Sequence, residues 1–326
     1  MNNMFNQCKK LKALDLSSFD TSLVKNMNYM FNGCLELGSL NVASFSTSKV
    51  ISFIGMFMGC SSISSLDLSN FDTSSAQNMN FMFSDCKNLT SLDLSNFNTL
   101  NTVNMEHMFL GCSSLTSINL TNFDSSKVTD MCGMFAHCYK VKSIILPTLH
   151  NSQLLDTNYM FHMCGSLESL DFSKFDTSLV TKMDGMFEGC SSLTSINFNN
   201  FNTSNVIYMN NMFNGAGLIS LDLSSFDTSN TEDISYMFAG ISNIASLDLS
   251  FFDTSKVKYM SQLFYLSHNL KYLDLKNFII PENISIDNFI DSNLINPIIC
   301  IDDIQSFNKI ISLLKCYDKY CNIKEK

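Results

Sequence analysis

Tryptophan is absent from this sequence of 326 residues, which contains only three prolines and twelve glycines. This composition excludes collagen-like segments and argues against long irregular loops. Positive charge is also scarce, because 20 Lys and Arg stand against 30 Asp and Glu, and the net charge is −10. A nucleic-acid surface needs clustered Lys and Arg to neutralise phosphates, and docking on anionic lipid also needs basic residues. We therefore expect no nucleic-acid partner.

No apolar run approaches the ~20 residues that a membrane-spanning helix requires, so we expect no membrane span. The first residues, MNNMFNQCKK, do not combine a charged leader with an apolar stretch, as a signal peptide does. The H-E-x-x-H and G-x-S-x-G motifs, the Walker loop and the dinucleotide fingerprint are also missing. We expect a protein that is not an enzyme, with no catalytic residue, no cofactor and no metal site.

A Met-Phe pair recurs with a period of 26 residues from Met4-Phe5 to Met237-Phe238, with a single step of 25 residues after Met212, and Leu263-Phe264 is an eleventh, variant copy. Each copy follows a Leu-x-Leu segment, whose alternation is typical of a strand. An Asp-Thr-Ser cluster comes next and suits an Asx turn, a Ser/Thr turn or a helix N-cap. Val, Met, Met, Phe and Cys then follow at spacings of three and four, which predicts the apolar face of a short helix.

Neither the strand nor the helix of one repeat can bury its apolar side alone, and stacking of successive coils removes this problem. The pattern predicts an α/β repeat solenoid of about eleven coils over residues 1–279. The chain starts in mid-repeat, so we expect further coils upstream. Residues 280–326 lack the period, and the apolar spacing from Ile301 to Leu314 predicts an amphipathic helix. We interpret this segment as a C-terminal cap; the rival interpretation is a helix that docks on a partner.

Eight cysteines share one position of the repeat: Cys8, Cys34, Cys60, Cys86, Cys112, Cys138, Cys164 and Cys190. Ala216, Ile241 and Ser267 take this position in later coils, which indicates packing instead of metal ligation. C-x-x-C pairs are missing, and neighbouring coils would hold the Cβ atoms too far apart for a disulfide. We therefore expect buried free thiols on this cysteine ladder. Cys132, Cys300, Cys316 and Cys321 lie off it, and a bridge among those of the cap stays open.

The middle residue of each Leu-x-Leu segment should point away from the core. We call this polar column the strand-face strip; it consists of Asp15, Asn41, Asp67, Asp93, Asn119, Asp171, Asn197, Asp222, Asp248 and Asp274, with Ile145 as an interruption. It is either a solvated face that blocks unwanted sheet contacts, a binding strip for a protein or glycan, or a row of calcium ligands. The Asp or Asn that follows the first Phe of each repeat forms a second column, to which we assign turn or cap formation.

The order Leu-x-Leu, Phe-Asp-Thr-Ser, Val-x-x-Met-x-x-Met-Phe-x-x-Cys and Leu resembles the BspA-like leucine-rich repeat family of surface proteins. The resemblance implies a right-handed coil of leucine-rich-repeat type, with a parallel sheet on one face and short helices or turns on the other. It also implies a surface or secreted protein, located at the cell surface or outside the cell, that takes part in adhesion or protein binding without catalysis. The alternative is an intracellular scaffold for protein–protein interactions. Neither the ligand nor the oligomeric state follows from the sequence.

Overall fold

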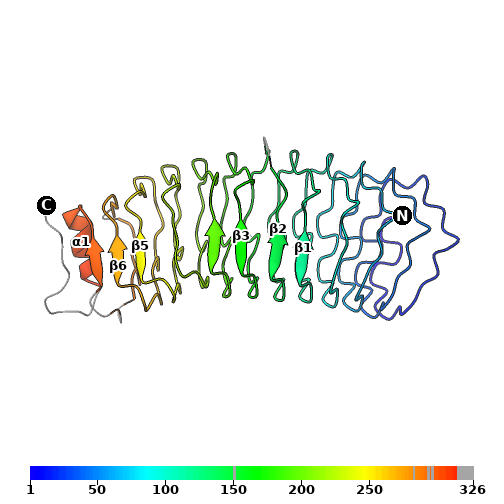
Figure 1. Cartoon of the computed structure of the whole chain (residues 1–326), viewed down its shortest axis with the longest axis horizontal. Coiled ribbons are helices and arrows are strands. Elements are labelled where there is room, and N and C mark those ends of the chain that lie inside the picture. The colour runs from blue at the N-terminus through cyan, green and yellow to red at the C-terminus, as the bar shows by residue number, and fades with distance from the viewer. Residues whose placement is uncertain (150–151, 282, 292–293, 295–296, 314–326) are drawn as a thin grey trace.

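The computed structural model describes residues 1–149, 152–281, 283–291, 294 and 297–313. The chain winds into a long stack of coils with its first and last described residues at opposite ends (Figure 1). The strands are β1 (Ser117–Asn119), β2 (Ser143–Ile145), β3 (Ser169–Asp171), β4 (Ser195–Asn197), β5 (Ser246–Asp248), β6 (Tyr272–Asp274) and β7 (Ile298–Cys300), and the one helix in these residues is α1 (Ile304–Ile311). No described helix has the length and apolar composition needed to cross a membrane.

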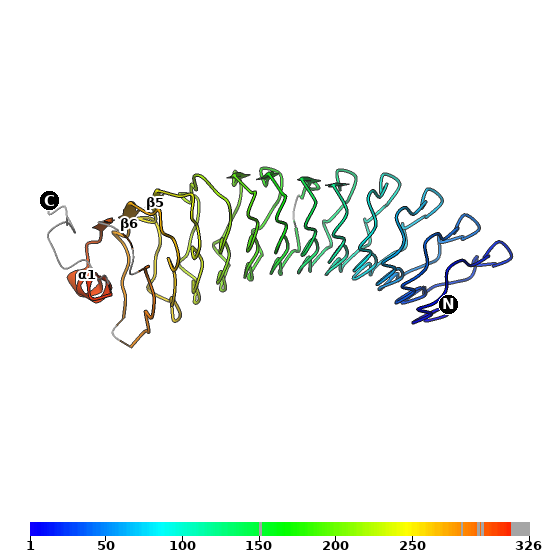
Figure 2. The ribbon, with the colours of Figure 1, turned by 90° about the horizontal axis from the view of Figure 1, so that it is seen from below.

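The strands pair in parallel, and each pair is offset by one repeat, as in Ser117↔Ser143 and Ser246↔Tyr272. They form three short sheets, β1-β2, β3-β4 and β5-β6-β7, so the expected single sheet through all the Leu-x-Leu segments is wrong. Figure 2 shows a physical reason: the stack is curved, and the strands lie along its convex side, where the coils fan apart. Backbone groups on that side can reach the next coil at only some positions.

A longer ladder lies on the face opposite the strands, where the Met-Phe segments form the concave side of the stack (Figure 2). Parallel bridges join one residue of each successive coil: Asn26, Ser52, Asn78, Asn104, Asp130, Asp156, Lys182, Tyr208, Asp233 and Tyr259. Alternate backbone N–H groups donate to the next coil, as Phe31 N does to Met56 O at 2.8 Å. This face therefore supplies the regular hydrogen bonding between coils.

The short helices that the spacing predicted are not confirmed: the described Met-Phe segments are runs of tight turns, the other form that the family resemblance implied for this face. The N–H of Met30 donates to Met27 O, and the N–H of Cys34 donates to Phe31 O. Tyr29 has φ 54° and Gly33 has φ 71°, so the third residue of each turn is left-handed, as in a type II turn. An α-helix would need right-handed residues throughout and bonds to the fourth preceding residue. Apart from α1, the described chain is a parallel-strand β-solenoid, with turns where helices were the first expectation.

The phenylalanine of each Met-Phe pair forms a continuous stack from Phe5 to Phe264. Successive ring centroids are 5.4 to 5.8 Å apart, and no pair is tilted by more than 17°. The next ring, Phe289, meets Phe264 edge-on at 82°, where the sequence repeat has ended. The stack is the centre of one core that runs through all the coils.

The prediction of buried free thiols is confirmed for the ladder from Cys34 to Cys190. Each thiol donates to the carbonyl oxygen of the Met-Phe phenylalanine in the preceding coil, as Cys112 Sγ does to Phe83 O at 3.1 Å. Burial raises the pKa of the Cys86 thiol to about 12. Cys8 is exposed, contrary to the prediction. Cys300 is buried and free, whereas Cys316 and Cys321 lie outside the described residues.

A second polar ladder, which the sequence reading missed, joins the coils through buried threonines. Thr73 Oγ1 donates to Asn98 O at 2.9 Å and accepts from Asn98 N at 2.8 Å. The same pair of bonds is made by Thr21, Thr47, Thr177, Thr203, Thr228 and Thr254. The Asp-Thr-Ser cluster therefore has two roles, since its Asp forms a turn and its Thr ties one coil to the next.

Helix α1 packs at the C-terminal end of the stack. Asp303 is its N-cap and accepts from Ser306 N at 2.7 Å, and Lys309 Nζ donates to Pro281 O at 2.8 Å. The parallel ladder continues past residue 279, because β7 pairs with β6 in the same register of 26 residues. The division at 279/280 and the choice between a cap and a docking helix stay predictions.

Candidate binding surfaces

Nine of the ten strip residues are exposed, as expected, but Asp274 is buried. Asp274 Oδ2 pairs with Lys276 Nζ at 2.9 Å and lies 3.3 Å from the Tyr272 hydroxyl. The placement of Asp274 on the exposed strip is therefore wrong. Asp274 lies beside strand β7, which pairs with β6 at this end of the sheet. The side chain is therefore shielded from solvent.

Each strip residue also forms an Asx turn, a role that the sequence reading did not weigh for this column. Its Oδ1 accepts the backbone N–H two residues further along, at 2.9 to 3.2 Å. These backbone hydrogen bonds lower the pKa of the exposed carboxyls, for example those of Asp67 and Asp93. Asn can accept the same bond, which explains its alternation with Asp. Whether the strip also binds a partner stays a prediction.

The second column forms the expected turns. Asp72 Oδ1 accepts from Ser74 N at 3.0 Å, and the equivalent bonds occur in the other regular coils. Among the described residues, no three His, Cys, Asp or Glu side chains converge as a metal ion would require.

The strip is interrupted at the sixth coil, where Ile145 is 52% exposed. Within the described chain, strand β2 ends one sheet, strand β3 begins the next, and the two strands do not pair with each other. A hollow of about 420 Å³ lies at this break, and Ile145, Pro147, Asp171 and Lys174 are among the residues that line it. The strip is therefore two polar stretches on either side of a partly apolar notch.

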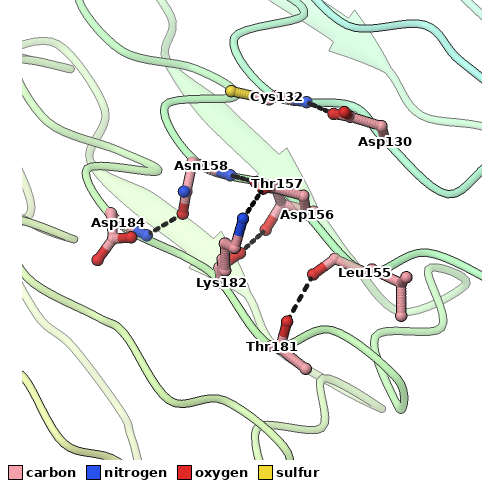
Figure 3. A network of polar contacts seen from close by, with 9 residues as sticks. All are labelled: Asp130, Cys132, Leu155, Asp156, Thr157, Asn158, Thr181, Lys182 and Asp184. Carbon is pink, nitrogen blue, oxygen red and sulfur yellow. Dashed lines mark hydrogen bonds and ion pairs between the residues drawn. The ribbon is translucent and has the colours of Figure 1, made fainter.

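The concave face carries charged side chains that the sequence reading did not single out. Figure 3 shows part of it, where Lys182 Nζ pairs with Asp156 Oδ2 at 2.9 Å. Asp130 Oδ1 accepts from Cys132 N at 2.9 Å in the neighbouring coil. Burial is the main cause that raises the pKa of Asp130. This half-buried network joins successive coils through side chains as well as through the backbone.

Asp184 is the most perturbed carboxyl of this network. Its backbone N–H donates to Asn158 Oδ1 at 2.8 Å, as Figure 3 shows, but its own Oδ1 is buried without a hydrogen-bond partner. Burial, followed by the negative charge of Asp233, raises the pKa of Asp184 to about 6. The sequence carries one sign of these residues: the residue type at their repeat positions changes from coil to coil, whereas the residue type at the inward positions stays nearly constant.

Histidines and tyrosines that are scattered through the sequence also meet here. His137 Nδ1 lies 2.8 Å from the Tyr139 hydroxyl, and the rings of His137 and His162 contact edge-on at 5.0 Å. His162 Nδ1 lies 3.2 Å from Glu188 Oε2, and the Tyr159 ring packs edge-on against His162 at 5.6 Å. The histidines occupy different repeat positions, so the repeat pattern carries no sign that neighbouring coils bring them together.

Solved structures with a similar fold include a leucine-rich cell surface protein from Faecalibacterium prausnitzii A2-165, at 17% identity and a TM-score of 0.47 over 98% of this chain and 79% of that one. A leucine-rich repeat protein from Bacteroides ovatus ATCC 8483 matches at 16% identity and a TM-score of 0.37, over 84% of this chain and 81% of that one. A chain of the TLR13-ssRNA13 complex matches at 21% identity and a TM-score of 0.33, over 70% and 31%. With TM-scores below 0.5, none supports a statement about what this chain binds.

No curated protein matches the chain. The model of a family described as "Mycoplasma protein of unknown function, DUF285" matches residues 1–119, 103–198 and 192–294. Together these matches span most of the solenoid, including every Met-Phe pair. The chain therefore belongs to the DUF285 family.

Proposed function

We propose that this chain is a non-enzymatic binding module of a surface or secreted protein, and that it holds a protein or glycan ligand on its outer faces. One observation carries the proposal: the inward positions repeat almost unchanged, whereas outward positions on the concave face differ from coil to coil. The bridge column alone holds Asn, Ser, Asp, Lys and Tyr. A solenoid offers an extended surface on which such variation can specify a partner.

Two surfaces are available for this role. The strand-face strip is the candidate from the sequence, and its exposed carboxylates give it a negative charge. The concave face offers the half-buried carboxyls around Lys182 together with half-exposed tyrosines such as Tyr208, at 39%. The net charge of −10 supports the view that neither surface binds nucleic acid.

The experiment that tests the proposal compares two variants from which three charges have been removed. The first variant replaces Asp67, Asp93 and Asp171 with Asn. The second variant replaces Asp130, Asp156 and Asp184 with Asn. Asn keeps an Oδ1 that can accept the turn hydrogen bond, and Asn already occupies the equivalent positions in other coils, at Asn119, Asn104 and Asn158. Folding should therefore survive in both variants, so that a change in binding reports on the charge.

The purified chain is first offered to arrays of peptides and of oligosaccharides, and the dissociation constant of a captured ligand is then measured for both variants. Loss of affinity in one variant assigns the ligand to that face. Unchanged affinity in the strip variant removes the strip as the site, and an empty result on both arrays contradicts the binding function.

The location of the protein needs a separate test. The resemblance to BspA-like leucine-rich repeat proteins supports a cell-surface or extracellular site, and the alternative is an intracellular scaffold. Protease treatment of intact cells that express the full-length protein should digest this chain under the first proposal. Full protection of the chain would favour the scaffold.

A further inference from the structure

A hollow of about 520 Å³ lies beside the cysteine ladder, and its lining comes from three successive coils. Asp85 and Lys87 line it from one coil, Leu110 and Ser113 from the next, and His137 and Tyr139 from the third. Its volume lies in the range of roughly 300–1,000 Å³ that is usual for small-molecule sites. No single repeat contains these groups, so the hollow exists only because the coils stack.

Tyr139 is a fixed aromatic surface at this hollow. Its side chain is 50% exposed, and its hydroxyl lies 2.8 Å from His137 Nδ1. The ring of His137 is itself held edge-on by His162, whose Nδ1 lies 3.2 Å from Glu188 Oε2. This chain of contacts orients the Tyr139 ring before any ligand arrives, so that binding would cost little side-chain entropy.

The backbone at the hollow is unusual for the residues that it carries. Asp85 has φ 57° and His137 has φ 60°, at a repeat position that glycine holds in six other coils: Gly33, Gly59, Gly111, Gly189, Gly215 and Gly240. The left-handed conformation costs free energy for residues with a Cβ. Gln7, Met163 and Leu266 take the same conformation at this position in other coils, and Asp85 and His137 are the two non-glycine residues of the set that line the hollow. A Cβ on the intervening Gly111 would lie 2.8 Å from Asp85 Oδ1. The coils thus place polar side chains here at an energetic cost.

The charges of the lining cancel. Asp85 Oδ1 lies 3.6 Å from Lys87 Nζ, and both side chains are well exposed. Burial, with the neighbouring His162, lowers the pKa of His137, so that its imidazole is neutral near pH 7. The hollow therefore offers hydrogen-bond donors and acceptors without a net charge that would select an ionic ligand.

We propose that this hollow binds a short neutral oligosaccharide. The apolar C–H face of a sugar ring packs on an exposed aromatic ring, and its hydroxyls hydrogen-bond to carboxylate, ammonium and hydroxyl groups such as those of Asp85, Lys87 and Ser113. The apolar lining consists of Leu110 and the Tyr139 ring, which is too little for the buried hydrophobic anchors of a protein partner. The inference rests on the proposed binding function and names one ligand class and site for it.

The test uses the whole chain and a panel of neutral probes: maltotriose, cellotriose, mannotriose, triacetylchitotriose and lactose. Saturation-transfer difference NMR detects binding, and calorimetry gives the dissociation constant. Tyr139→Ala should weaken the binding of the captured sugar about tenfold or more, because it removes the stacking surface. Tyr139→Phe keeps the ring and should change affinity much less.

The matched control is Phe251→Ala, which removes another exposed aromatic side chain, 55% exposed, in a coil far from the hollow and outside both candidate binding surfaces. It should leave sugar binding unchanged. Thermal unfolding of each variant shows that the fold is kept. Two results would overturn the inference: no saturation transfer from any probe at about 10 mM, where even millimolar affinities are visible, or undiminished binding in Tyr139→Ala. If a peptide from the array binds while no sugar does, the site proposal fails and the binding function stands.

Discussion

The threonine ladder supports the most direct test of how the coils hold together. Thr73 is fully buried, and its hydroxyl makes two hydrogen bonds to the backbone of Asn98 in the next coil. Replacement of Thr73 with Val keeps the shape of the side chain and removes the hydroxyl. The Asn98 N–H and C=O then lose their partner at the same time.

The magnitude follows from the two lost bonds. A typical hydrogen bond contributes about 0.5–1.5 kcal/mol net, so the loss of two bonds in Thr73→Val should destabilise the chain by about 1–3 kcal/mol. The control, Thr73→Ser, keeps both bonds and loses one methyl group, at about 1 kcal/mol. Serine occupies the equivalent buried position at Ser125, so the fold accepts a side chain of this size there, although the Ser125 hydroxyl itself has no hydrogen-bond partner among the described residues.

Two measurements check this difference. Urea unfolding followed by circular dichroism compares the free energies of unfolding, and hydrogen exchange reports on the Asn98 amide itself. In Thr73→Val that amide should exchange more than tenfold faster, while amides several coils away, such as that of Met209, change little because repeats contact only their neighbours. A Val variant as stable as the Ser variant, with unchanged exchange at Asn98, would refute the reasoning.

Three further predictions concern the core and the concave face. Phe83→Ala opens the phenylalanine stack and should cost ~3–5 kcal/mol in chemical unfolding, and a loss below about 1 kcal/mol would contradict its buried position. A thiol reagent followed by mass spectrometry should modify exposed Cys8 in the native protein and spare buried Cys112, and equal rates would be inconsistent with the ladder. Asp184 has a pKa of about 6 when folded, above its ordinary value of 3.8, so the folded state binds its proton more tightly and this carboxyl favours folding as the pH falls from about 7 to 4. Asp184→Asn should therefore raise the melting temperature at pH 7.5 relative to the unmodified chain and lose this advantage near pH 4; an equal difference at both pH values would rule out the titration.

Much of each coil could be predicted from the sequence, because the same pattern of apolar and polar residues recurs in almost every repeat. Cys34 to Cys190, the Met-Phe phenylalanines from Phe31 onward and most of the apolar residues that flank the middle of each Leu-x-Leu segment were placed inward by their spacing, and the structure buries them. The second Asp column was assigned to turns, and Asp72 forms one. Asp274 was misplaced because the pattern of its own coil carries no sign of the strand β7 beside it.

The secondary structure of the Met-Phe segments could not be determined from the sequence alone, for a physical reason. Apolar residues at spacings of three and four fit a short helix, and they fit consecutive turns equally well. What separates the two is the destination of the backbone N–H groups, and Phe31 N donates to Met56 in the next coil. That acceptor exists only when the coils are stacked, so the choice belongs to the tertiary structure.

The sequence by itself determined the period, the side chains that face the core and the turns that close each coil, since all of these depend on residues close together along the chain. Only the tertiary structure decided the curvature, which makes the Met-Phe side concave, and the threonine bonds between coils. It also brought Asp85, His137 and Tyr139 to one hollow. Such contacts join residues about one or two repeats apart, and their geometry is set by how one coil rests on the next.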